Sequence, residues 1–136
     1  MKITKRLFAI TLFSALLFMG ACSKYEDGPA VSVLTKKARL SRAWVVEKYI
    51  DGDDGEETAG NNDDVLTFYK DGNYSYTSGI FNVDGNWSFI NNDEDLQTQY
   101  SILGISTTDH VKILRLTTKE LWVQEDNNDE IHYIAK

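Results

Sequence analysis

The sequence predicts an all-β protein: an eight-stranded up-and-down meander barrel that follows a short N-terminal helix. Two observations predict this fold. From Trp44 onward, apolar and polar residues alternate with a period of two, in short runs rich in β-branched and aromatic residues. Eight such runs follow one another through short connections, and eight strands suffice to close a small barrel without exposed edges. A Greek-key sandwich is the competing architecture, although only residues 51–64 approach the length of connection that it needs.

Residues 31–42 precede the first strand and predict a short amphipathic helix. Val31, Leu34 and Ala38 fall at i, i+3 and i+7, with basic residues between them. The helix leads directly into the first strand, so it is expected to close the nearer end of the barrel.

The predicted strands differ in how sharply their ends are marked. They cover residues 44–50, 65–70, 73–78, 85–90, 96–102, 110–116, 120–124 and 130–135. Asp71-Gly72 is the strongest hairpin signal, because both residues tolerate the positive φ angles of a type I′ turn. The next turn falls at either Ser78-Gly79 or Asp84-Gly85, so residues 79–84 are expected to be a loop or a bulge. Residues 103–109 are expected to be a longer connection. The connections at 51–64 and 103–109 lie at the same end of a meander, so this end is the expected mouth.

The N-terminal residues have the layout of an export signal. Residues 1–21 carry three basic residues, a largely apolar run from Leu7 to Met19 and two small residues. The apolar run is shorter than the roughly 20 residues of a transmembrane helix. The expected organisation is a signal peptide at 1–21, a tether at 22–30 and a barrel domain at 31–136.

Cys22 is the chain's one cysteine and follows the predicted signal peptide directly. A lone cysteine in an exported chain forms no internal disulfide, and no Cys or His spacing typical of zinc sites is present. Met19-Gly20-Ala21-Cys22 resembles the lipobox of bacterial lipoproteins, in which the cysteine becomes the acylated first residue. Soluble secretion is the alternative. The resemblance implies that Cys22 is a lipid attachment site and that a membrane is a partner of this chain.

The charge balance bears on the partners of the chain. The formal net charge is −7, and loss of Lys2, Lys5 and Arg6 with the signal would change it to −10. Such an acidic protein repels nucleic acid. Residues 51–64 hold seven carboxylates, which could keep the domain soluble or dock a basic protein partner. Their spacing does not match a calcium loop, so no metal site is predicted, and weak divalent-cation binding stays open.

Catalysis and ligand binding receive different support. His110 and His132 are the two histidines, and they fall on different predicted strands; neither an enzyme nor a cofactor is predicted. Aromatic residues on the expected inward faces are the better candidates for a site. They either fill the barrel or line a pocket for a small apolar or aromatic ligand, and the candidates are Trp44, Phe68, Tyr74, Tyr76, Trp87, Phe89 and Tyr100.

Several motifs in order resemble a known family. A lipobox, a strand with Trp44, and then "LTFYKDGNYSYT", "GNWSF" and "ILRLTTKELWVQE" are similar to the lipocalin-like domain of small Bacteroidota lipoproteins. The polar, partly acidic residues 23–27 also resemble the export tag of those lipoproteins. A plain solvated linker of the same composition is the alternative interpretation. The resemblance implies a calyx-forming barrel in the cell envelope, held on the outer membrane and exposed at its surface.

Overall fold

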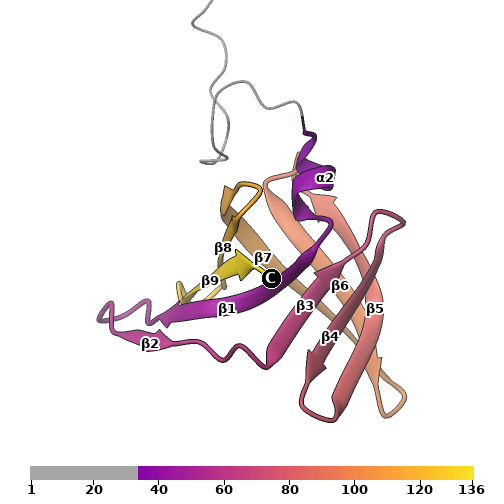
Figure 1. Ribbon diagram of the computed structural model, residues 1–136, viewed down its shortest axis with the longest axis horizontal. Coiled ribbons are helices and arrows are strands. Elements are labelled where there is room, and N and C mark those ends of the chain that lie inside the picture. Colours follow the sequence, from indigo (N-terminus) through magenta and orange to yellow (C-terminus); the bar gives the residue numbers. More distant parts are fainter. Residues whose placement is uncertain (1–33) are drawn as a thin grey trace, which may run out of the picture.

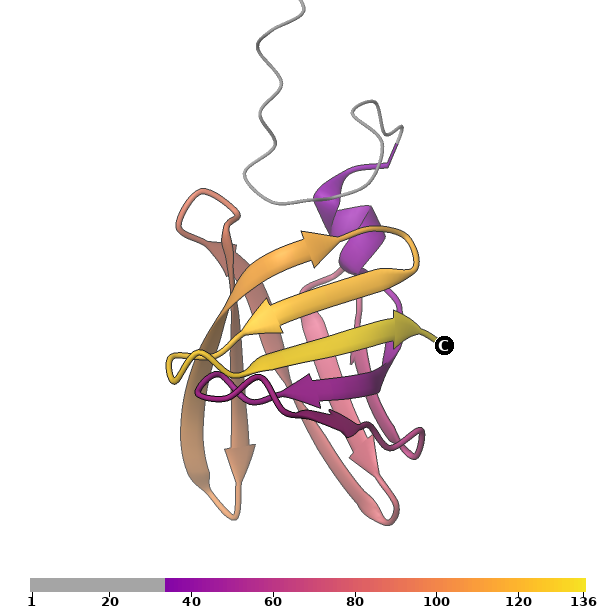
Figure 2. The ribbon, with the colours of Figure 1, turned by 90° about the vertical axis from the view of Figure 1, so that its left-hand side faces the viewer.

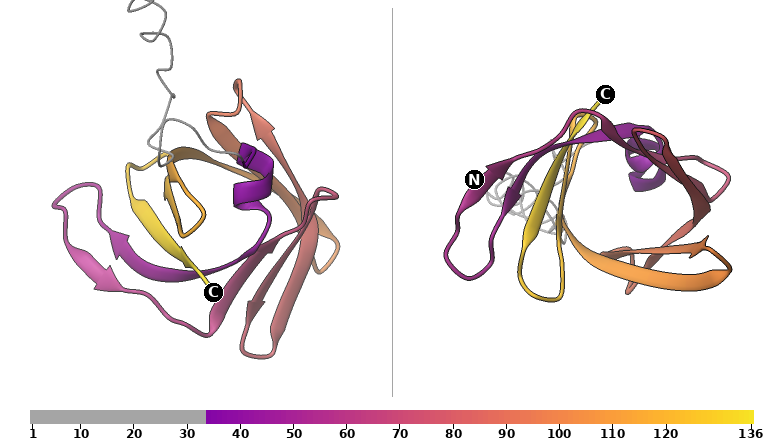
Figure 3. Two further views of the ribbon diagram at one scale, coloured as in Figure 1. Left: turned by 45° about the horizontal axis from the view of Figure 1, so that its top comes forward. Right: turned by 90° about the horizontal axis from the view of Figure 1, so that it is seen from below.

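The computed structural model describes residues 34–136, so Cys22, the expected signal peptide and the expected tether lie outside the described residues. The described elements are α2 (Lys36–Leu40), β1 (Ala43–Ile50), β2 (Glu57–Ala59), β3 (Asp64–Phe68), β4 (Asn73–Ser78), β5 (Phe81–Ile90), β6 (Asp95–Ile102), β7 (Ile105–Leu116), β8 (Glu120–Gln124) and β9 (Glu130–Ala135). The strands form one antiparallel sheet in the order β2-β1-β3-β4-β5-β6-β7-β8-β9, and β1 also pairs with β9. This last pairing closes eight strands into a ring (Figures 1 and 3), which confirms the predicted all-β barrel.

The helix α2 lies at one end of the barrel and forms part of its core (Figure 1). Thr35 begins the helix, because its side-chain oxygen accepts a hydrogen bond from the backbone N–H of Ala38. Leu40 is fully buried in the same cluster as Trp44 and Leu116, and the Trp44 indole N–H donates to the Leu40 carbonyl at 2.9 Å. The expectation that a helix closes this end of the barrel is therefore confirmed.

The extent and the buried face of the predicted helix were wrong. The helix has five residues, and it buries Arg39 and Leu40, whereas Leu34 is 40% exposed. Val31 lies outside the described residues. In so short a helix, the direction in which the chain enters β1 decides which side chains are buried, and helical periodicity carries little weight.

Two connections expected to be loops are instead tight turns between longer strands. Gly79 and Ile80 link β4 to β5, with Ser78 paired to Phe81, and Gly79 has a φ of 57°. The turn therefore falls at Ser78-Gly79, one of the two predicted positions, and the prediction of a loop or bulge over residues 79–84 was wrong. Gly85 lies inside β5, at a position where β6 approaches too closely for a side chain. A Cβ on this residue would lie 2.1 Å from the carbonyl oxygen of Gln99.

The second such connection is Leu103-Gly104, which replaces the predicted loop at 103–109. Both residues have positive φ, 51° and 82°, and β7 already begins at Ile105. This is the left-handed geometry that two-residue hairpins favour. At the predicted Asp71-Gly72 turn, Gly72 alone of the pair has a positive φ, 90°, so the type I′ assignment was wrong although the hairpin forms there.

The connection at 51–64 is also partly ordered. Its residues Glu57–Ala59 form β2, which pairs with Lys48–Ile50 of β1. The Nζ of Lys48 lies 2.8 Å from a carboxylate oxygen of Glu57. The acidic segment therefore folds back along the wall of the barrel.

Two long hairpins, β4–β5 and β6–β7, extend beyond the closed ring. The pairing of β5 with β6 ends at Gly85 and Tyr100. Beyond this point, residues 81–84 of β5 pair with β4 alone and residues 101–102 of β6 pair with β7 alone, while β4 continues to pair with β3. Figure 2 shows the tips as two separate projections at the end opposite α2. The barrel is thus closed at the α2 end and flared at the other.

Candidate functional site

A cavity of about 980 Å³ lies inside the flared half of the barrel. Its lining includes residues close to four connections: Asp64 at the start of β3, Ser78 and Phe81 beside the β4–β5 turn, Ile102 beside the β6–β7 turn, and Asp126 between β8 and β9. These connections lie at one end of the meander, opposite α2. The predicted position of the mouth is therefore confirmed.

The deep wall of the cavity is apolar. It is formed by four buried side chains that also belong to the core cluster: Phe68, Leu96, Leu121 and Val123. They come from β3, β6 and β8. Strand alternation places them inside the barrel, since every second residue of a strand points to the same face.

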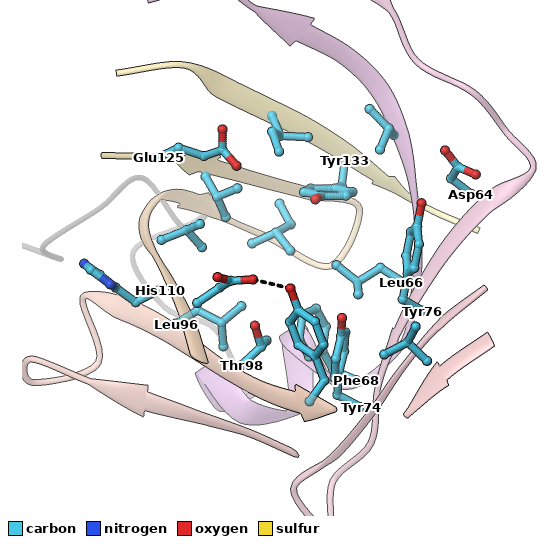
Figure 4. A pocket seen from close by; sticks show the side chains of 18 of the residues that line it. Asp64, Leu66, Phe68, Tyr74, Tyr76, Leu96, Thr98, His110, Glu125 and Tyr133 are labelled. Atoms are coloured by element: carbon cyan, nitrogen blue, oxygen red, sulfur yellow. Dashed lines mark hydrogen bonds between the residues drawn. The ribbon is translucent and has the colours of Figure 1, made fainter. Parts of the chain in front are cut away.

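Tyrosines surround the cavity above this wall. Tyr74, Tyr76 and Tyr133 lie around it in Figure 4, and Tyr49 and Tyr100 also line it. The Tyr100 hydroxyl donates a hydrogen bond to a carboxylate oxygen of Asp109 at 2.7 Å, drawn as the dashed line in Figure 4.

The hydroxyls of Tyr74, Tyr100 and Tyr133 stay protonated over a wide pH range. Burial raises the pKa of Tyr74 to about 12, with smaller contributions from Tyr100 and Asp109. Burial is also the main cause that raises the pKa of Tyr133, and Glu125 adds to it. For Tyr100, the hydrogen bond to Asp109 is the largest cause of its raised pKa. The cavity therefore presents neutral phenols, which can donate as well as accept hydrogen bonds.

Two solved structures from Bacteroides share this architecture. A protein from Bacteroides uniformis ATCC 8492, described as lipocalin-like, superposes with a TM-score of 0.58 at 14% identity, covering 72% of this chain and 99% of that chain. The fold is lipocalin-like. An uncharacterized protein from Bacteroides eggerthii DSM 20697 superposes with the same TM-score of 0.58 at 12% identity, covering 71% of this chain and 99% of that chain. No protein-family model matches the sequence, and no curated protein matches it.

The lipocalin-like barrel separates the predicted site residues into two groups. Phe68, Tyr74, Tyr76 and Tyr100 line the cavity. Trp44, Trp87 and Phe89 do not line it, because they pack nearer the α2 end. Trp87 there stands edge-on to Phe68 and Phe89, with ring centroids 5.7 and 5.4 Å apart. Side chains therefore fill the half of the barrel near α2, and a cavity occupies the other half.

The sequence predicted an acidic mouth from the carboxylates of residues 51–64 and from Asp126, but the predicted site residues included none of the carboxylates that line the cavity. Asp64, Asp109, Glu125 and Asp126 all line it. The alternation pattern contained a signal for three of them. Asp64 stands two residues before Leu66, Asp109 two before Val111 and Glu125 two after Val123, and each of these apolar residues also lines the cavity.

The two histidines lie apart. His110 is exposed at the edge of the cavity, where its Nε2 lies 3.5 Å from a carboxylate oxygen of Asp126. His132 is buried and stacks on Trp122 with ring centroids 4.2 Å apart, while its Nε2 lies 2.9 Å from Glu130. Residues 131 and 133 line the cavity, so strand alternation points His132 to the opposite face of β9.

Among residues 34–136, no group of three or more His, Cys, Asp or Glu side chains is placed to hold a metal ion. The same residues include no helix that is long and apolar enough to cross a bilayer.

Proposed function

We propose that this chain is a membrane-tethered, lipocalin-like lipoprotein that binds one small apolar or aromatic ligand in its calyx without catalysing a reaction. The observation that supports binding is the cavity itself. Its volume of about 980 Å³ lies at the upper end of the roughly 300–1,000 Å³ typical of small-molecule sites. A filled eight-stranded barrel would have left no such space.

The lining suits a ligand with an apolar or ring-shaped body. The deep wall offers aliphatic side chains and Phe68, and the tyrosines add aromatic faces with hydroxyl groups. No hydrogen bond within the described residues engages the hydroxyls of Tyr74 and Tyr133. Such groups fix the orientation of a ligand in a largely apolar pocket.

Native mass spectrometry of the delipidated protein tests the binding proposal. We expect an additional mass from a co-purified small molecule. Thr98→Trp would fill the cavity from β6 and should remove that mass. Gln97→Trp is the matched control, because the neighbouring residue is not part of the lining. Retention of the mass by Thr98→Trp would contradict a ligand in the calyx.

The tether is proposed from the lipobox at Met19–Cys22. Several acyl chains on one cysteine hold a protein stably on a membrane, whereas a single chain binds only marginally. Cys22→Ser should move the protein from the outer-membrane fraction to the soluble fraction, and Ser23→Ala should not. A Cys22→Ser protein that still sediments with membranes would refute lipid attachment.

A second candidate is a non-catalytic interaction module. The observation that favours it is the exposed acidic segment 51–64, which is partly ordered by β2 and by hydrogen bonds from the backbone N–H groups of Asp53 and Asp54 to the Asp51 carboxylate. A basic protein partner would then dock there. Salt-sensitive capture of such a partner, lost in Asp53→Asn/Asp54→Asn, together with an empty calyx, would favour this function over ligand binding.

A further inference from the structure

The charged side chains that line the calyx have a strong bias in sign. Four of them are carboxylates, those of Asp64, Asp109, Glu125 and Asp126. Among the described residues that line the cavity there is no lysine or arginine, and His110 is the basic side chain present. The bias is local to the cavity, because the lysines and arginines of residues 34–136 lie elsewhere on the barrel.

Few positively charged groups of the described residues lie close enough to balance the negative charge of these carboxylates. Asp126 faces the His110 imidazole at 3.5 Å, and both side chains are largely exposed. Asp109 accepts the phenol hydrogen of Tyr100, which is a neutral donor. The Oδ1 of Asp64 is buried without a hydrogen-bond partner among residues 34–136, and within the same range the Glu125 carboxylate has no salt bridge.

The carboxylates stand at the outer part of the calyx, above its apolar wall. Glu125, Asp126 and Asp109 are exposed, whereas Phe68 and Leu121 on the deep wall are at most 1% exposed. In Figure 4, Asp64 and Glu125 lie on opposite sides of the cavity, with Tyr133 between them. A positive group at this level would also face the tyrosine rings, and cations are attracted to such rings.

We propose that the calyx selects a cationic amphiphile. Its amine or ammonium group would lie among the carboxylates of Asp64, Asp109, Glu125 and Asp126, here called the mouth carboxylates, and its apolar or aromatic body would contact the apolar deep wall. This inference rests on the proposed ligand binding and names its chemistry. An anionic ligand of the same shape is repelled by the same carboxylates, and no lysine or arginine of the described lining could pair with its head group.

Three probes with one carbon skeleton test the selectivity: 4-phenylbutylamine, 4-phenylbutanol and 4-phenylbutyrate. They carry a cationic, a neutral and an anionic head on the same aromatic body. Isothermal titration calorimetry with the full chain at pH 7 should rank them in that order. Because the mouth carboxylates are partly exposed, we expect the amine to bind at least about fivefold more tightly than the alcohol. Added salt should reduce that ratio.

Two variants connect the selectivity to the named carboxylates. Glu125→Gln and Asp64→Asn remove one charge each with little change of shape, and each should lower the ratio of amine to alcohol affinity about two- to fivefold. Asp53→Asn is the matched control, since it removes a charge from the acidic 51–64 segment without altering the lining. Its ratio should equal that of the unmodified protein.

The outcomes separate the two proposals. If none of the three probes binds, the proposed ligand binding fails. If the alcohol or the carboxylate binds as tightly as the amine, binding stands and charge selection is refuted. An equal effect of Asp53→Asn and Glu125→Gln would assign the preference to the overall acidity of the protein and would also refute selection by the calyx.

Discussion

Replacement of Leu40 by alanine tests whether α2 is part of the barrel core. The Leu40 side chain is 0% exposed and belongs to the cluster that contains Trp44 and Leu116. Truncation of a fully buried leucine costs about 2–5 kcal/mol, and the upper part of that range applies where the surroundings cannot collapse onto the cavity. The barrel wall around Leu40 is held by strand pairing, so we expect a loss of about 3–4 kcal/mol. The backbone carbonyl that accepts the Trp44 indole N–H is retained, so the loss would come from packing.

Urea denaturation followed by tryptophan fluorescence measures this loss. The midpoint should fall while the dependence on denaturant stays constant, which indicates a change in stability alone. Leu34→Ala is the control: Leu34 is 40% exposed just before the same helix, and its replacement should change stability by no more than about 0.5 kcal/mol. A loss below about 1 kcal/mol for Leu40→Ala, or equal losses for both variants, would refute the idea that α2 closes the barrel.

Three further predictions concern the strands, the pH dependence and the hairpin tips. Gly85→Ala should destabilise the protein by about 1–3 kcal/mol in the same urea assay, because its Cβ would lie 2.1 Å from the Gln99 carbonyl oxygen. Burial raises the pKa of Tyr74 from 10.0 to about 12, so its contribution to stability is complete below pH 10 and is lost as the pH rises to 12. Between these pH values the free energy of unfolding of Tyr74→Phe should therefore fall less steeply than that of the unmodified protein, by up to about 1.4 kcal/mol per pH unit. Parallel plots of unfolding free energy against pH for the two proteins would contradict this. Ile80 and Leu103 are each 98% exposed at the two hairpin tips, so the double serine variant should shift the urea midpoint by less than the equivalent of about 0.5 kcal/mol, and a larger loss would indicate packing of the tips.

The hairpins show where local sequence signals succeed. Asp71-Gly72 marks a turn because glycine adopts a positive φ without strain, and Gly72 does so with φ of 90°. Asp84-Gly85 has the same dipeptide sequence but lies within β5 and forms no turn. There the glycine is required by the close approach of β6, which is a contact between segments that local sequence does not encode.

The candidate site shows the same division. Alternation correctly placed Phe68, Tyr74, Tyr76 and Tyr100 on the inner face of the barrel. It could not give their depth along the barrel axis. Trp44, Trp87 and Phe89 have an equally inward pattern, yet they pack at the closed end.

The sequence by itself therefore determined the class of fold, the inward faces of its strands and the end at which the barrel opens, because these depend on a two-residue period and on the order of connections. Only the tertiary structure decided that the interior holds a cavity and that carboxylates line it. The pairing of β1 with β9 sets the curvature of the barrel, and the early end of the β5–β6 ladder flares its mouth. Both depend on contacts between distant segments, so they appear only once the barrel has closed.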